Sequence, residues 1–201
     1  MWVIMAVILL FSILATRNMK AVPGPLQNIA EMAVSSLLGF FSGVLGEKKA
    51  RHYFPMLATF FILIIVSNYC GLIPGAGELF TVPTSVLAVT AALSTISFVA
   101  IQSSGIKKHG VGKYLLTFFK PVAVLFPIML LEQFIRPISM ALRLYGNIYG
   151  EELAAETLFE LFPLGVPIVM HVLSLLFCFI QAMVFTMLLA VFINEATEDE
   201  E

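Results

Sequence analysis

Charged residues are scarce in this sequence. Only 12% of its 201 residues are Asp, Glu, Lys or Arg, and 60% are hydrophobic, whereas a typical soluble domain is about half apolar and about a quarter charged. The net charge is only −2, so no long-range positive field points to nucleic acid as a partner. The composition therefore predicts a protein whose main solvent is lipid.

Cysteine and nucleotide-binding motifs are also lacking. Cys70 and Cys178 lie in apolar runs without a CxxC or Cys/His metal spacing, which argues against disulfide and zinc frameworks and favours small apolar fillers. The glycines at 105 and 110 have the spacing of a P-loop start, but Val111 and Gly112 follow instead of Lys and Ser/Thr. We expect no bound cofactor or metal, and any ATP chemistry to belong to another chain.

Long hydrophobic runs are abundant. Crossing about 30 Å of hydrocarbon takes roughly 20 apolar helical residues, and five segments approach that length: 1–16, 55–74, 84–106, a stretch within 114–158, and 168–193. We interpret the first as a short span rather than a signal peptide, because no basic region precedes it. Residues 26–46 alternate apolar and polar positions at helical spacing, which predicts an amphipathic helix at the membrane surface.

The fourth hydrophobic region is too long for one simple span. Pro121, Pro127 and Pro137 interrupt it, so we expect broken or strongly tilted helix there. The fold class predicted for 1–201 is a single all-α membrane domain of about five transmembrane helices plus the surface helix.

Basic residues predict the orientation. The five alternating spans place most of them on one side, which the positive-inside rule assigns to the cytoplasm: Arg17, Lys20, Lys48, Lys49, Arg51, Lys107, Lys108, Lys113 and Lys120. The opposite loops carry only Glu78 and Glu160 as charges. We therefore expect the N-terminus outside and the C-terminus in the cytoplasm.

The most informative residue is Arg143, because charge inside a membrane helix is costly and marks function by default. No carboxylate follows at i+3 or i+4; Glu151 lies 80° away around the helix and Glu152 falls on the opposite face. Its counter-charge must come from another helix or from another chain. Arg136 differs, since Glu132 four residues earlier suits an ordinary local ion pair.

The last span carries a polar stripe, made by His171, Ser174, Cys178 and Gln181. Such a stripe lines water or faces another helix. His171 suits either a structural role or a proton relay, and Gln181 suits either an ion path or an interhelical hydrogen bond. Asn68 and Thr84 either line an outward-facing cavity or bond to nearby backbone.

With these residues in view, the chain resembles subunit a of the F-type ATP synthase membrane sector. The segment from Arg136-Pro137 to Gly146-Asn147 is similar to the family's signature around its essential arginine. Further similarity lies at Val22-Pro23-Gly24, at Ser67-Asn68 with Ile73-Pro74, and at Ile180-Gln181-Ala182. The resemblance covers almost the whole chain.

The resemblance implies a tilted helical hairpin, 114–158 with 168–193, against a ring of c subunits that each carry a carboxylate, with Arg143 facing the ring. It implies that Asn147, Glu152 and Gln181 match polar residues on or near the family's two ion half-channels, and that Asn68 and Thr84 match outward-side ones. Glu151 is a further candidate, at a position that varies between glycine, histidine and acid in the family. In part of the family a histidine stands at the position of Ser174, so His171 is a displaced candidate for proton relay.

The implied role is that of a stator subunit without nucleotide chemistry, in a bacterial plasma membrane beside the b subunits of the peripheral stalk and the rest of the complex. A stand-alone transporter is the first alternative, but no internal repeat supports it. A scaffold is the second, but it has no need of Arg143. The sequence leaves open whether the ion is H⁺ or Na⁺, the size of the ring, and the direction of operation.

Overall fold

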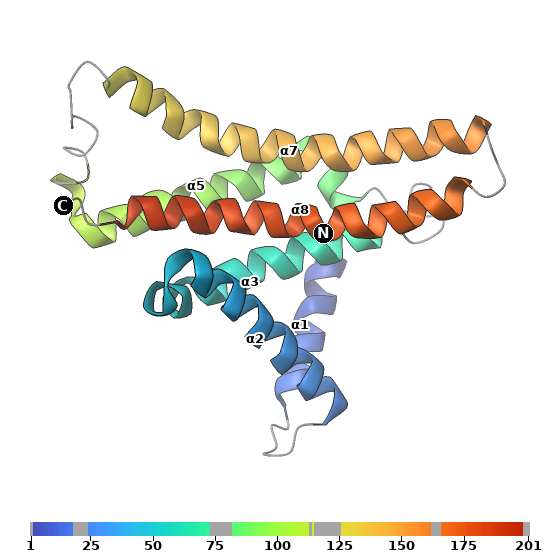
Figure 1. The fold of residues 1–201 in the computed structure, drawn as a ribbon, viewed down its shortest axis with the longest axis horizontal. Coiled ribbons are helices and arrows are strands. Elements are labelled where there is room, and N and C mark those ends of the chain that lie inside the picture. The colour runs from blue at the N-terminus through green and yellow to red at the C-terminus, as the bar shows by residue number, and fades with distance from the viewer. Residues whose placement is uncertain are drawn as a thin grey trace.

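The chain is a helical bundle from which two helices project (Figure 1). The computed structural model describes residues 2–17, 24–72, 82–112, 114, 126–161 and 166–198. These residues form six α-helices and one 3-10 helix, with no strand among them: α1 (Trp2–Thr16), α2 (Pro25–Leu45), α3 (Glu47–Cys70), η1 (Pro83–Ser85), α5 (Leu87–His109), α7 (Phe126–Leu161) and α8 (Val166–Ala196). The predicted all-α class is confirmed.

Helix boundaries follow local sequence signals. Pro25 occupies the first turn of α2, where its missing N–H costs nothing. Gly46 separates α2 from α3 with a φ of 76°, and Gly110 follows α5 with a φ of 77°. Both lie in the left-handed region that glycine adopts without steric cost, so the chain turns at these points.

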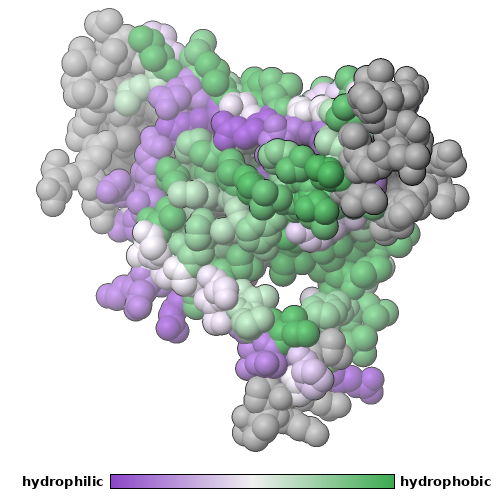
Figure 2. Space-filling view, turned by 45° about the vertical axis from the view of Figure 1, so that its right-hand side comes forward, coloured by the Kyte–Doolittle hydropathy of each residue, from purple (hydrophilic) through white to green (hydrophobic). Residues whose placement is uncertain are grey.

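The core is centred on α8, which packs against α2, α3, α5 and α7. Its residues Phe185, Leu189 and Ile193 are buried together with Leu57 and Ile64 of α3. In contrast, large apolar side chains on the outside of the bundle are exposed, such as Trp2 at 84%. Figure 2 shows an extensive hydrophobic face with hydrophilic residues at its margins, as expected of a surface that meets lipid.

Several predicted boundaries shift. The second span, expected over 55–74, is part of a helix that starts at Glu47 and ends at Cys70; residues 73–81 lie outside the described part of the chain. The third span runs from Leu87 to His109. The last, expected to end at residue 193, continues to Ala196.

The fourth region is not broken where the structure describes it. Pro137 lies inside α7, which is one continuous helix of 36 residues; Pro121 and the rest of 115–125 lie outside the described residues. A proline inside a helix removes one intrahelical hydrogen bond, the one that its missing N–H would donate to the Gln133 carbonyl. The Ser94 hydroxyl of α5 donates to the Pro137 carbonyl, which ties α7 to α5 at this point. At 1.5 Å per residue α7 is about 54 Å long, far more than the roughly 30 Å of hydrocarbon, a length that suits the predicted strong tilt.

Length and apolarity alone give four described helices that are able to cross a membrane: α2, α3, α5 and α8. α1 is too short for that criterion, and α7 carries Arg136, Arg143 and several glutamates. The criterion therefore includes α2, which the amphipathic pattern places on the membrane surface, so the surface location of α2 stays a prediction.

Candidate functional site

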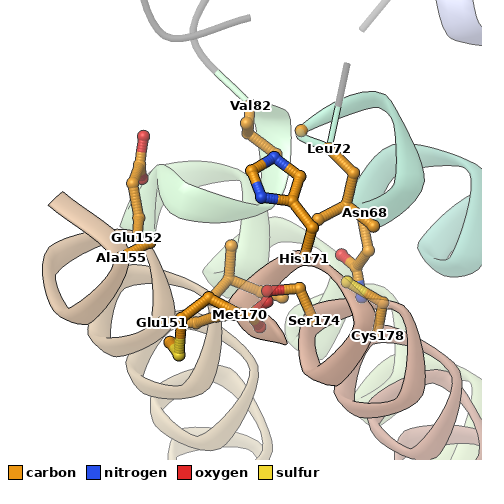
Figure 3. Close-up of a pocket in the computed structure, with 12 residues that line it drawn as sticks. Asn68, Leu72, Val82, Glu151, Glu152, Ala155, Met170, His171, Ser174 and Cys178 are labelled. Carbon is orange, nitrogen blue, oxygen red and sulfur yellow. The ribbon is translucent and has the colours of Figure 1, made fainter. Parts of the chain in front are cut away.

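A polar cavity opens between α3, α7 and α8 (Figure 3). Its volume is about 170 Å³, which is enough for several water molecules. Its walls combine carboxylate, imidazole, amide and hydroxyl groups with apolar side chains: Asn68, Gly71, Leu72, Val82, Ile148, Glu151, Glu152, Ala155, Met170, His171, Ser174 and Cys178. Eight residues are predicted to line the ion path, and five of them lie on the cavity wall: Asn68, Glu151, Glu152, His171 and Ser174.

Glu151 and Glu152 reach the cavity from α7. Glu151 is half-buried and Glu152 is exposed. In Figure 3, His171 extends from α8 on the other side of the cavity, with Ser174 one turn further along the same helix. Acidic and imidazole groups on facing helices form a surface on which a proton can be exchanged with water.

Asn68 forms the inner wall on the α3 side. Its side chain is 2% exposed, and neither its amide nitrogen nor its carbonyl oxygen has a hydrogen-bond partner. A buried amide without partners is costly unless water or an ion satisfies it. Asn68 therefore fits a hydrated cavity. The alternative prediction, a hydrogen bond from Asn68 to nearby backbone, does not agree with the structure.

Thr84 does not belong to the described cavity wall. It lies in η1, fully buried, and its hydroxyl has no partner. Ser67, which the sequence analysis did not single out as a site residue, is likewise fully buried with an unpartnered hydroxyl. The one sequence signal for a buried polar Ser67 is its position next to Asn68.

The polar stripe on α8 continues past the cavity. Ser174, Cys178 and Gln181 are all buried, and Gln181 accepts a hydrogen bond from the Asn147 side-chain amide of α7. This bond confirms the interhelical interpretation of Gln181. The Gln181 side-chain nitrogen has no partner, so it is able to donate a hydrogen bond to water in an ion path. The ion-path interpretation of Gln181 stays a prediction.

Arg143 lies one helical turn before Asn147, and its side chain is exposed. Among the described residues no ion pair involves it, whereas Arg136, seven residues earlier on the same helix, binds Glu132 and Glu195. The sequence predicted the Glu132 pair but not Glu195, because a contact 59 residues away has no local signal.

Small residues surround Arg143 on its own stripe of α7. Ser139 lies at i−4, Gly146 at i+3 and Gly150 at i+7, and all three are exposed. A Cβ atom built on either glycine would meet nothing within 4 Å. The face that carries Arg143 is thus shallow, which permits close approach of another helix.

These features define a class: a polytopic membrane protein with a cavity lined by carboxylates and an imidazole, and with an exposed arginine that has no ion pair among the described residues. Charge of this kind inside a membrane is typical of an ion pathway. The sequence model of the family described as ATP synthase A chain matches residues 1–194. The chain belongs to this family, whose members are stationary ion-translocating subunits of the ATP synthase membrane sector.

Individual relatives agree. ATP synthase subunit a 3 of Pelobacter propionicus is 42% identical over 202 residues, which cover 98% of this chain and 86% of the relative. ATP synthase subunit a of Geotalea daltonii is 40% identical with the same coverage. The Moorella thermoacetica subunit a is 36% identical over 192 residues, which cover 96% and 86%.

Proposed function

We propose that the cavity is the outer half-channel of an ion path and that Arg143 couples this path to a rotor. The observation that carries the proposal is the contrast on α7 between Arg143, exposed and without an ion pair among the described residues, and Arg136, bound to two carboxylates. An arginine inside the membrane needs a counter-charge, and a rotor carboxylate supplies it intermittently.

The outer path begins at the cavity. Glu151, Glu152 and His171 exchange the ion with water, while Asn68 and Ser174 hold water on the inner wall. Asn147 and Gln181 extend the polar route from the base of the cavity toward Arg143. Thr84 is left out of this route, because it is not part of the cavity wall.

The partner proposed at Arg143 is a ring of c subunits. The exposed Ser139, Gly146 and Gly150 support a close helix contact there. When a ring carboxylate arrives, the guanidinium favours its ionised form and so releases the ion. The fixed positive charge also keeps ions from passing directly between the two half-channels.

The driving energy is about 2.3 kcal/mol per charge for each 100 mV of membrane potential. An ion that enters from the cavity travels on the ring and leaves on the cytoplasmic side. The residues alone do not select between H⁺ and Na⁺, so the proposal names a monovalent cation.

The proposed location is a bacterial plasma membrane, with the N-terminus outside and the C-terminus inside. Arg17 ends the described part of α1, while Lys48 and Lys108 lie near the start of α3 and the end of α5. In Figure 1, α2 runs obliquely to α8, from beside the end of α1 to the start of α3. The exposed apolar side chains of α1 suit contact with lipid and with b subunits of the peripheral stalk.

The test is Arg143→Ala in the complete complex, with ATP synthesis driven by an ion gradient in membrane vesicles. We expect a loss of at least about 100-fold, since an arginine–carboxylate pair at 4 Å is worth about 4 kcal/mol at an effective dielectric constant of about 20. Arg51→Ala is the control, because Arg51 is exposed near the start of α3; it should retain synthesis. Gradient-driven synthesis in the Arg143→Ala complex would contradict the proposal.

A further inference from the structure

The two ends of the α7–α8 hairpin differ. At one end the helices enclose the polar cavity described above. At the other end, where α8 finishes, side-chain bonds tie it to its neighbours. The hairpin is thus open at one end and fastened at the other.

Arg136 is the centre of the fastened end. One of its Nη atoms donates to Glu132 and to Glu195, each at 2.7 Å, and its guanidinium lies 4.7 Å from the centre of the Phe192 ring. Glu132 is on the same helix as Arg136, whereas Glu195 and Phe192 are on α8. Only the contacts of Arg136 with Glu195 and Phe192 join α7 to α8.

The last turn of α8 is also held from α3. The Lys49 ammonium donates to the Asn194 side-chain oxygen at 3.0 Å and to the Thr197 carbonyl at 3.3 Å. The residue that Arg136 binds, Glu195, lies directly between these two. α8 is therefore a fixed support against which Arg136 can hold α7.

On α7, Arg136 and Arg143 share a stripe. Seven residues turn an α-helix by 700°, so the two side chains differ by only about 20° in direction and by about 10 Å along the axis. A contact that fixes the rotation of α7 at Arg136 therefore fixes the direction of Arg143. The effect of such positioning is large, since a displacement of about 1 Å can cost roughly 100-fold in rate.

We propose that the Arg136–Glu195 ion pair is a positioning contact for ion translocation: it sets the rotation of α7 so that Arg143 faces the rotor. This inference rests on the function proposed above for Arg143. Arg136 itself touches neither ion nor rotor in the proposed mechanism, and it acts through Arg143.

The structure offers a matched pair of variants. Glu132 and Glu195 bind the same Nη atom at the same distance, and their side chains are 56% and 54% exposed. Glu195→Gln weakens the bond between helices, while Glu132→Gln weakens only a bond within α7. Because exposed ion pairs add little to stability, neither variant should lower the amount of the chain in the membrane.

The experiment measures ATP synthesis driven by an ion gradient in vesicles that hold the complete complex. We expect Glu195→Gln to lower synthesis about fivefold and Glu132→Gln to keep synthesis within about twofold of the unaltered chain. The double change Arg136→Glu with Glu195→Arg should recover at least about half of the activity that Arg136→Glu alone loses. Recovery by exchanged charges distinguishes the pair from a general effect on folding.

Two results would overturn the inference: equal effects of Glu132→Gln and Glu195→Gln, or a double change no better than Arg136→Glu alone. If Glu195→Gln is absent from the membrane, the exchanged pair decides, since its recovery supports the contact and its failure contradicts it. Arg143→Ala in the same vesicles separates the two proposals. Normal ATP synthesis in the Arg143→Ala complex rejects the coupling role of Arg143. If Arg143→Ala abolishes synthesis while Glu195→Gln leaves it normal, only the positioning contact is rejected.

Discussion

At the scale of single residues, α7 contains two arginines with opposite surroundings. Arg136 is bound by two glutamates and is 14% exposed, whereas Arg143 is exposed with no ion pair among the described residues. The same chemical group is therefore a structural contact in one place and a free charge in the other. Surroundings rather than residue type separate their roles.

Glu152 is the more accessible carboxylate of the cavity, so we expect it to collect the ion. Glu152→Gln removes the charge and keeps the shape, which should slow ion flux several-fold while the complex still assembles. Passive ion flux through vesicles stripped of the soluble sector measures this. Glu156→Gln is the control, because Glu156 is an exposed residue of the same helix outside the cavity wall; equal flux in both variants would remove Glu152 from the path.

Asn68 gives a prediction in which assembly and flux separate. No protein group bonds to the buried Asn68 amide, so Asn68→Leu breaks no hydrogen bond within the protein, and the complex should still assemble. Flux should fall several-fold, because the inner wall no longer holds water. Ser67→Ala, adjacent but outside the cavity wall, should leave flux unchanged. An Asn68→Leu complex that assembles and conducts normally would contradict the hydrated wall.

At the scale of elements, α7 performs two tasks on different faces. Its buried residues Met140, Leu144 and Ile148 pack into the core, while Ser139, Arg143 and Gly146 form an exposed stripe. A helix that presents small residues outward exposes backbone that a larger side chain would cover. We attribute this face to contact with the rotor.

Gly146→Leu tests the exposed stripe. Leu favours helix over Gly by roughly 0.8 kcal/mol, and no atom lies within 4 Å of the added Cβ, so the chain should fold at least as well. The added bulk should reduce gradient-driven ATP synthesis at least about tenfold by separating Arg143 from the rotor. Gly43→Leu on α2 makes the same change at a glycine with equally open surroundings, and we expect normal synthesis. Normal synthesis with Gly146→Leu would show that this face is not the rotor contact.

At the scale of the whole molecule, the helices cannot all run along the membrane normal. α7 is about 54 Å long, and Figure 1 shows it alongside α8 while α1 and α2 project to one side. If α2 lies on the cytoplasmic surface, α7 and α8 cross the bilayer obliquely. A polar cavity at one end of the hairpin then faces outside.

Thiol labelling distinguishes a surface helix from a spanning one. Asn28→Cys and Lys48→Cys, made after replacement of both native cysteines, place thiols on exposed positions near the two ends of α2. A membrane-impermeant reagent should label both in inverted vesicles and neither in intact cells. Labelling from opposite sides would show that α2 spans the membrane, as its length and apolarity alone permit.

The sequence by itself determined the all-helical membrane class, the lack of a carboxylate near Arg143 on its own helix and the polar stripe on the last span, because these depend on composition and on the period of a single helix. It left open whether the helix around Pro137 is broken or strongly tilted, and the structure has one continuous helix there, whose 36 residues suit a strong tilt. The role of Thr84 stays a prediction, because Thr84 is buried close to Val82 of the cavity wall but is not part of that wall. The tertiary structure alone decided that Asn68, Glu151 and His171 share one cavity and that Glu195 binds Arg136. Such contacts join residues distant in the chain, and helical periodicity gives the direction of a side chain on its own helix but not the helix that it meets.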